Sequence, residues 1–307
     1  MQYDLVIIGG GPAAVAGGVY AARKKLKTAI IATELGGQSV VSEDIQNWIG
    51  TPSISGMDLV KSFKAHLDAY KADIVELHEG QTVSKLEKKE DGSFVTTTDK
   101  GESFESRAVL VASGANRRRL PAKGADEFEH KGLTYCASCD GPMFTDMDVV
   151  VIGGGNAGFE TAAQLLAYTK SVTLLHRGAD FKADPITVEK VLADPKMTAI
   201  TNANISEVLG DKFVTGMKYE INGEEKEMAT SGIFVEIGMV PSTDFAEGLV
   251  PMDDYKRIKV DGKSQQTEMP GVWAAGDCTD ELYHQNNIAA GDAVKALEDI
   301  YVHLKTK

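Results

Sequence analysis

Apolar and polar residues follow one another along this chain in blocks that predict a strand, a helix and a second strand. Residues 4–8, which contain the apolar run of residues 5–8, predict a buried parallel strand, and the alanine-rich residues 13–25 predict a helix. A further apolar run, Thr28–Ala32, predicts the next strand. With the glycines at residues 9–11 as the turn, this βαβ unit is typical of the start of a doubly wound sheet.

The same pattern returns in the second half of the chain. Residues 149–152 predict a strand, residues 157–168 a helix and residues 172–175 a strand. We therefore expect an α/β fold with two Rossmann-like dinucleotide-binding domains. The other predicted elements are antiparallel strands within 81–112 with a turn at Asp91-Gly92, antiparallel strands at 214–221 and 232–238, a strand at 272–275, a helix through Val60, Phe63 and Leu67, and a closing helix at 288–304.

Two linker-like segments, near residues 114–120 and at Val240-Pro241, separate these patterns. They predict that the second domain is inserted into the first. We expect one domain from residues 1–115 and 245–307, and the other from residues 116–244. The arginine triplet at residues 117–119 is interpreted as part of a solvated linker rather than as a phosphate site.

Composition fits a protein of two ordinary domains. The 307 residues are 43% hydrophobic and 25% charged, and the net charge of −13 argues against a general nucleic-acid or anionic-membrane surface. No apolar stretch reaches the roughly 18 residues of a membrane span. Because the chain has three cysteines, two of them close together, it fits a reducing compartment. We expect a soluble, cytoplasmic protein.

The first glycine turn has the form of a dinucleotide fingerprint. Its glycines let the backbone approach a pyrophosphate, which then lies at the positive N-terminus of the following helix. An acid about twenty residues further on, Glu34, is placed to bind a ribose hydroxyl. The candidate cofactor-binding residues here are Gly9, Gly11, Pro12, Ala13, Ala14 and Glu34.

The second fingerprint is a full Gly-x-Gly-x-x-Gly match, with candidate residues Gly153, Gly155, Asn156, Ala157 and Gly158. His176 and Arg177 end its second predicted strand, and Lys182 follows. Cations at this position accommodate the 2′-phosphate of NADPH, whereas an acid selects NADH. Asp180 is close enough to serve as that acid, so NADH stays open, and a solvated strand end is the plainer interpretation of the cations.

A pair of cysteines, Cys136 and Cys139, lies just before the second fingerprint and is followed by Asp140. This spacing permits a disulfide, and such motifs can lower a thiol pKa toward neutrality. Half a zinc site is the alternative, but Cys278 is the only further cysteine. A second alternative is that Cys136 and Cys139 only pack in the core. Cys278 itself is interpreted as a small buried hydrophobe. We favour a redox role for the pair, and a flavin is suited to reduce it because a flavin can accept a hydride and pass electrons to sulfur. The first site is therefore assigned FAD, and the second a nicotinamide.

Together these residues closely resemble the low-molecular-weight thioredoxin reductases, and they are similar to the C-terminal reductase part of the alkyl hydroperoxide reductase flavoprotein. The resemblance covers essentially the whole chain. Its motifs are Gly36-Gly37-Gln38, Asn47-Trp48, Ala112-Ser113-Gly114, Cys136–Asp140 with Gly141-Pro142, Gly153–Gly158 and Gly276-Asp277. It implies FAD contacts at Gly37, Gln38, Asn47, Gly114, Gly276, Asp277 and Gln285.

The resemblance also implies roles for the redox motif. Cys139 would take electrons from the flavin, Cys136 would attack the disulfide of a partner protein, and Asp140 would manage protons. It implies a homodimer and a rotation of the inserted domain. The sequence departs from the family at Gly178, where NADPH-specific members usually have arginine, at Ser113 in place of threonine, and at Gln285–Ile288, which is less apolar.

The leading hypothesis is an NADPH-driven, FAD-dependent disulfide reductase for a thioredoxin-like protein. One alternative is an NADH-dependent reductase for a peroxiredoxin-like or glutaredoxin-like carrier. Such flavoproteins usually have an extra N-terminal segment, and here the flavin strand begins at residue 4, so a separate carrier would be needed. The other alternative is a flavoprotein that uses nicotinamides poorly and is fed by another donor, which the change at Gly178 favours.

Overall fold

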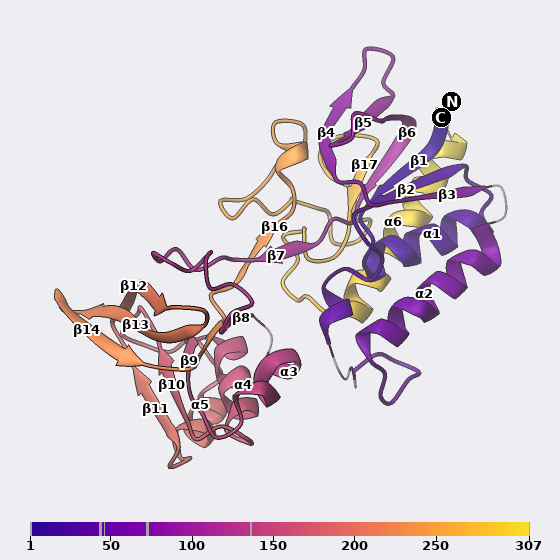
Figure 1. Cartoon of the computed structure of the whole chain (residues 1–307). Helices are drawn as coiled ribbons and strands as arrows, with labels where there is room; N and C mark the ends of the chain where they lie inside the picture. The colour runs from indigo at the N-terminus through magenta and orange to yellow at the C-terminus, as the bar shows by residue number, and fades with distance from the viewer. Residues whose placement is uncertain (1, 43–44, 46, 72–73, 136, 307) are drawn as a thin grey trace. The chain divides into compact units, whose positions relative to one another are not determined.

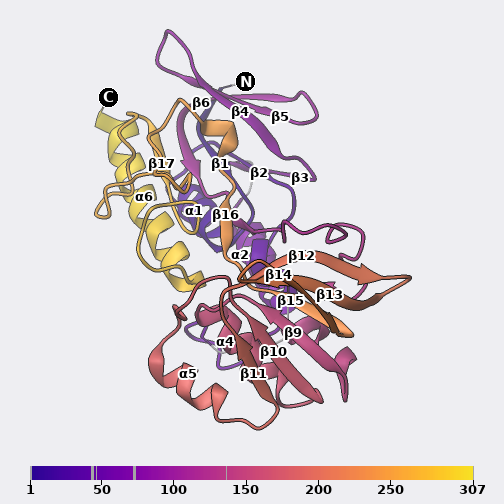
Figure 2. The same cartoon turned by 90° about the vertical axis from the view of Figure 1, so that its left-hand side faces the viewer.

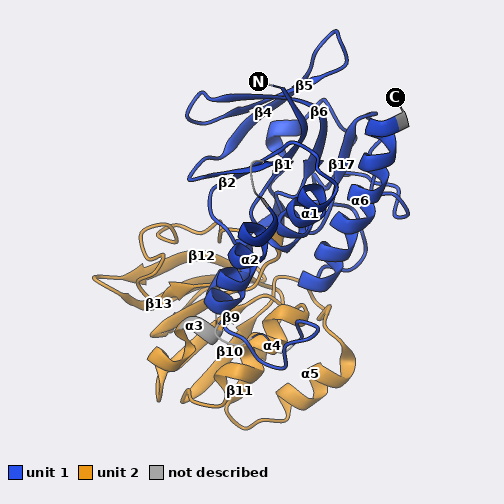
Figure 3. Ribbon diagram, turned by 90° about the vertical axis from the view of Figure 1, so that its right-hand side faces the viewer, with its two compact units in different colours: residues 1–116, 240–307 blue, residues 117–239 orange. Residues whose placement is uncertain are grey.

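In the computed structural model, the chain folds into two compact units (Figures 1 and 3). Unit 1 comprises Met1–Asn116 and Val240–Lys307, and unit 2 comprises Arg117–Met239. The structure describes residues 2–42, 45, 47–71, 74–135 and 137–306. The chain passes between the units through β7 (Ala115–Arg117) and β16 (Met239–Pro241), which pair with each other. The second crossing precedes the predicted boundary at residue 245 by a few residues. Within the described residues, no helix is both long and apolar enough to span a membrane.

Unit 1 is built on a seven-stranded sheet with the order β3-β2-β1-β6-β5-β4, and β17 also pairs with β6. The strands β1, β2, β3, β6 and β17 run parallel, whereas β4 and β5 are antiparallel to their neighbours. The bounds are β1 (Gln2–Ile8), β2 (Thr28–Ala32), β3 (Val75–Glu79), β4 (Val83–Lys88), β5 (Phe94–Thr98), β6 (Ser103–Val111), β17 (Val272–Ala274), α1 (Pro12–Arg23), α2 (Gly56–Lys71), α6 (Asn286–Thr306), η1 (Gly37–Val41) and η3 (Asp244–Ala246).

Both faces of β1 are buried from Leu5 to Ile8, which explains the uninterrupted apolar sequence of these four residues. Leu5 and Ile7 pack with α1, α2 and α6 on one face, where these helices lie together in Figure 1. Val6 and Ile8 pack on the other face with residues of β4, β5 and the segment after η3. The alternation follows from the period of two of a strand.

Unit 2 repeats this plan on a smaller scale (Figure 2). Its parallel sheet has the order β11-β10-β9-β15-β8, with α4 packed on one face and a three-stranded antiparallel sheet, β12-β13-β14, on the other. The bounds are β8 (Leu133–Thr134), β9 (Asp148–Ile152), β10 (Ser171–Leu175), β11 (Met197–Ile200), β12 (Ala203–Gly210), β13 (Val214–Ile221), β14 (Glu224–Ala229), β15 (Gly232–Val235), α3 (Ala137–Asp140), η2 (Gly141–Phe144), α4 (Asn156–Leu165) and α5 (Pro185–Leu192).

The predicted elements are confirmed with one exception. The turn at Asp91-Gly92 joins β4 to β5, with Gly92 at φ +86°. The strand predicted at 232–238 was assigned the wrong direction, because β15 is parallel and pairs with β9 and β8. All four residues of β15 are buried, and this continuous burial is typical of a central parallel strand rather than of an alternating antiparallel one.

Candidate functional site

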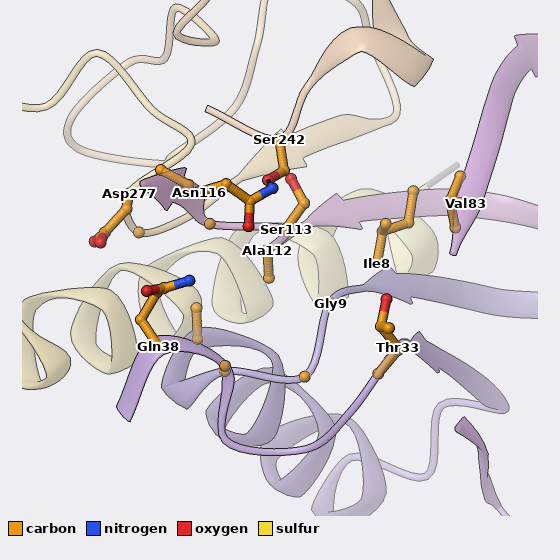
Figure 4. A pocket seen from close by; sticks show the side chains of 18 of the residues that line it. Ile8, Gly9, Thr33, Gln38, Val83, Ala112, Ser113, Asn116, Ser242 and Asp277 are labelled. Atoms are coloured by element: carbon orange, nitrogen blue, oxygen red, sulfur yellow. Dashed lines mark hydrogen bonds between the residues drawn. The ribbon is translucent and has the colours of Figure 1, made fainter. Parts of the chain in front are cut away.

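A cavity of about 580 Å³ opens at the carboxyl ends of the parallel strands in unit 1 (Figure 4). The ends of β1, β2, β6 and β17 all contribute to its wall. Ligands of open α/β sheets bind at this edge. Ten predicted residues line it, namely Gly9, Gly11, Pro12, Ala13, Glu34, Gly37, Gln38, Gly114, Gly276 and Asp277. Ala14 is fully buried behind the wall, and Asn47 and Gln285 are hydrogen-bonded to each other outside it.

The turn between β1 and α1 explains why glycines are needed. Gly9 has φ +127°, and a Cβ there would lie 2.1 Å from the Ala112 carbonyl oxygen. A Cβ on Gly10 would lie 2.0 Å from the Glu34 carbonyl oxygen. Over Gly11, in contrast, no atom lies within 4 Å of the Cβ position, and no side chain caps the N-terminus of α1. The backbone N–H groups of this helix end are therefore available to an anion in the cavity.

Figure 4 shows how the wall is arranged along the cavity. Thr33 and Val83 lie at one end and Gln38 and Asp277 at the other, with Gly9 between them. Burial raises the pKa of the Asp277 carboxyl, and the charge of His284 acts in the opposite direction. The cavity thus offers a helix N-terminus in its middle and polar side chains at both ends, which fits an extended dinucleotide.

Sequence reasoning missed part of this wall. Asn116 donates a hydrogen bond to the Ser242 hydroxyl over 2.9 Å, and Figure 4 shows Ser113 beside them. Further lining residues that were not predicted as cofactor contacts include Thr33, Gln81–Ser84, Thr243–Phe245, Asn286 and Ala289. Thr33 directly follows a predicted strand and Ala289 lies at the start of the predicted closing helix, whereas Gln81–Ser84 and Thr243–Phe245 had no comparable signal.

The second fingerprint forms the same local structure in unit 2. Gly153 has φ +132°, and a Cβ there would lie 2.0 Å from the Glu236 carbonyl oxygen. A Cβ on Gly158 would lie 2.0 Å from the Gly153 carbonyl oxygen. The close approach of α4 to the end of β9 therefore requires a residue without a side chain at position 158. Over Gly155 the space is open, and α4 has no side-chain cap. Asn156 and Ala157 begin this helix, whose N-terminus is a second anion-ready site.

The predicted phosphate-binding cations differ in exposure. His176 is buried, its Nε2 atom is 3.0 Å from the Asp180 carbonyl oxygen, and its ring packs against Phe181. Arg177 and Lys182 are exposed. The backbone N–H of Lys182 donates to the Gly154 carbonyl oxygen over 2.7 Å, which holds this loop against the fingerprint turn.

A buried carboxyl group at the same edge of the sheet was not predicted. Glu236 directly follows β15, and burial raises its pKa, against the opposing effects of Arg117 and Thr161. The Thr161 hydroxyl donates to it over 3.0 Å, and the Arg117 guanidinium lies 3.7 Å away. Arg117 is therefore partly an ion-pair residue, rather than only a solvated linker residue as interpreted from the sequence.

The redox motif follows the short strand β8. Cys136 lies outside the described residues, and so does the side chain of Cys139, whose backbone belongs to α3. Asp140, the last residue of α3, accepts a hydrogen bond from the Thr134 hydroxyl at the end of β8. Ala137 packs with residues of α4, which places α3 beside the helix of the second fingerprint.

The third cysteine has the environment of a core residue rather than of a reactive thiol. Cys278 is fully buried, and its Sγ atom lies 3.4 Å from the Ala275 carbonyl oxygen and 3.6 Å from that of Val111. Burial raises the pKa of its thiol to about 11. Its predicted role as a small buried residue is confirmed. In the part of the chain that the structure describes, no cluster of three or more His, Cys, Asp or Glu side chains could hold a metal.

The two Rossmann units, each with an open glycine turn at a helix N-terminus, define an α/β oxidoreductase with two dinucleotide-binding domains. The chain belongs to the pyridine nucleotide-disulphide oxidoreductase family, whose sequence pattern matches residues 3–293. This membership and the solved neighbours below make it a flavoprotein, and they imply FAD and a pyridine nucleotide.

Solved thioredoxin reductases share the fold over nearly the whole chain. The Lactococcus lactis enzyme in its FR conformation is 31% identical with a TM-score of 0.87, and covers 99% of this chain and 100% of its own. The T. acidophilum enzyme is 35% identical with a TM-score of 0.82, and 98% of each chain is covered.

Two curated relatives have other names. A Bacillus subtilis (strain 168) protein named NADH dehydrogenase is 38% identical over 296 residues, and an alkyl hydroperoxide reductase component of Escherichia coli (strain K12) is 38% identical over 299 residues. Each match covers 96% of this chain and 57% of the relative. The chain thus spans little more than half the length of these two proteins.

Proposed function

We propose that the protein is an FAD-dependent disulfide reductase that passes two electrons from NADPH, through the flavin and the Cys136/Cys139 pair, to a thioredoxin-like protein. The observation that carries this proposal is the packing of α3, which begins directly after Cys136, beside α4, which opens the second dinucleotide site. A Cys-x-x-Cys sequence whose helix packs on a nucleotide helix favours an electron-transfer role over a structural one.

FAD is assigned to the cavity of unit 1. Its pyrophosphate would lie on the N-terminus of α1 at the Gly9–Ala14 turn, and Glu34 would bind a ribose hydroxyl. Gln38, Asp277 and the residues around Gly114 would contact the flavin end, with Asn47 and Gln285 supporting it. When bound, this group accepts a hydride and returns two electrons to a disulfide.

The nicotinamide nucleotide is assigned to the N-terminus of α4 in unit 2. Arg177 and Lys182, both exposed, would hold the 2′-phosphate of NADPH through charge-assisted hydrogen bonds. His176 would act by packing against the fingerprint turn, since its Nε2 atom already faces the Asp180 carbonyl oxygen.

In the thiol step, the Cys136 thiolate would attack one sulfur of the partner's disulfide. A mixed disulfide forms, and the other partner sulfur leaves as a thiolate that takes a proton managed by Asp140. Cys139 then attacks Cys136, which re-forms the motif's disulfide and releases the second partner thiol. The partner gains two electrons and two protons, and the Cys136/Cys139 pair loses them. We also propose a homodimer and, because so few cysteines suit a reducing environment, a cytoplasmic location.

Anaerobic titration tests this proposal. The flavin absorbance of the purified holoprotein should bleach with stoichiometric NADPH and return when an oxidised thioredoxin is added. A Cys136→Ser variant serves as the control, because its flavin should still bleach but should no longer be reoxidised by thioredoxin. Bleaching without reoxidation of the wild type by any thioredoxin-like protein would refute the partner assignment.

A second candidate is a reductase arm of a peroxide-detoxifying system that uses NADH. It is favoured by the 38% identity to the Escherichia coli alkyl hydroperoxide reductase component, and Gly178 in place of arginine weakens the case for a phosphate site. Parallel stopped-flow reduction with NADH and NADPH discriminates the two candidates. Equal failure of both nucleotides would instead favour a flavoprotein that is reduced by another donor.

A further inference from the structure

Asn287, in the first turn of α6, connects this helix to a loop that lies 240 residues away in the sequence. Its Oδ1 atom accepts a hydrogen bond from the Ile49 backbone N–H over 3.4 Å, and its Nδ2 atom donates to the Asn47 carbonyl oxygen over 2.6 Å. Because both partners are backbone groups of fixed polarity, the orientation of the Asn287 amide is determined. No apolar side chain can make either bond.

Two further hydrogen bonds join the same segments. The Asn47 side-chain amide donates to Gln285 over 3.0 Å, and the Ser39 hydroxyl donates to the Asn286 side-chain oxygen over 3.1 Å. Ser39 and Asn286 both line the cavity of unit 1. We call the residues Asn47, Gln285, Asn286 and Asn287 the amide clasp. It joins the segment that begins at η1 to the start of α6, and each of these segments supplies part of the cavity wall.

We propose that the amide clasp retains the cofactor in this cavity, with Asn287 as its central residue. The inference rests on the proposed function only in taking FAD as the occupant. Separating the two wall segments to release a bound dinucleotide breaks the hydrogen bonds of the clasp. Those bonds therefore add to the barrier for release. Asn287 does not line the cavity and was not predicted to contact the cofactor, so it is a positioning residue whose effect falls on the dissociation rate.

The experiment measures FAD release from the holoprotein by the rise of flavin fluorescence after rapid dilution. Asn287→Ala removes two neutral hydrogen bonds at a partly exposed site, so release should become about tenfold faster. Asn287→Asp keeps an acceptor for the Ile49 N–H but opposes the Asn47 carbonyl with a second oxygen, and it should release FAD at least as fast. Asn204→Ala, at an exposed position of β12 in unit 2, is the matched control and should leave the rate unchanged.

The melting temperature of each apoprotein separates retention from general damage. Where Asn287→Ala lowers it, Asn287→Ser decides, because serine keeps a polar side chain at this position and is too short to reach both backbone groups. Faster release with unchanged association supports the clasp. Release at the wild-type rate in the Asn287 variants overturns it. A wild-type protein that binds no FAD instead refutes the proposed function, which keeps the two failures distinct.

Discussion

Adding one methyl group at Gly11 should weaken FAD binding without harming the fold. The Cβ position there has no atom within 4 Å, and φ of −76° is an ordinary value for any L residue. The folded apoprotein therefore has room for alanine. The same methyl group enters the space over the first turn of α1, where the pyrophosphate is proposed to lie.

The magnitude follows from overpacking. Forcing an extra methyl group into a filled contact costs about 1–3 kcal/mol. The dissociation constant of FAD should thus rise between about fivefold and about 150-fold in Gly11→Ala. Reconstitution of apoprotein with FAD, followed by the quenching of flavin fluorescence, measures this constant, and a thermal melt of the apoprotein checks the fold.

Two other glycines provide controls. Gly155→Ala makes the equivalent change in unit 2, where the space is also open, and should weaken nicotinamide binding while FAD binding stays normal. Gly9→Ala should destabilise the protein itself, because its Cβ would lie 2.1 Å from the Ala112 carbonyl oxygen at φ +127°. Normal FAD affinity in Gly11→Ala would refute the placement of the pyrophosphate on this turn.

Three further predictions concern other residues. Arg177→Ala should weaken NADPH binding about tenfold to a hundredfold, since a hydrogen bond to a charged group contributes about 1.5–3 kcal/mol. Fluorescence titrations should show no change in NADH binding, and equal losses of affinity for both nucleotides would contradict a phosphate contact. Because burial raises the pKa of the Cys278 thiol to about 11, the folded protein keeps a proton that the unfolded chain releases from about pH 9. The free energy of unfolding should therefore fall between these pH values, and urea melts of Cys278→Ala should lack this contribution. Thr134→Val removes the hydrogen bond to Asp140 and should slow thioredoxin reduction about tenfold in stopped flow. Flavin bleaching should stay unchanged, and Thr134→Ser, which keeps the hydroxyl group, should retain the wild-type rate.

The glycine turns could be predicted from the sequence because their causes are local. Gly9 and Gly153 need a positive φ, and their Cβ positions are blocked by a neighbouring backbone oxygen. Any sequence that forms this turn between a strand and a helix must place glycine there. The parallel sheets could be predicted for a similar reason, since residues 5–8 of β1 and 149–152 of β9 are buried on both faces and form continuous apolar runs.

The rest of the cavity wall depends on which strands become neighbours. Ser113 and Asn116 lie near Ser242 because β7 pairs with β16, and they reach the cavity because β6, which precedes them, lies beside β1 in the sheet. Neither pairing is encoded in a short sequence pattern. The same limit explains the wrong direction assigned to β15, whose partners β8 and β9 are fixed by topology. The hydrogen bonds of Asn287 likewise join residues that only the fold brings together.

Cofactor preference illustrates why residue type alone is insufficient. The sequence places His176, Arg177 and Lys182 in a cationic cluster, yet His176 is buried with its Nε2 atom 3.0 Å from the Asp180 carbonyl oxygen. A Cβ on Gly178 would lie 2.8 Å from that same Nε2 atom. A side chain at position 178 would therefore require the His176 ring to shift. We therefore expect packing beneath the loop, as well as the number of positive charges, to influence which nicotinamide nucleotide the proposed site prefers.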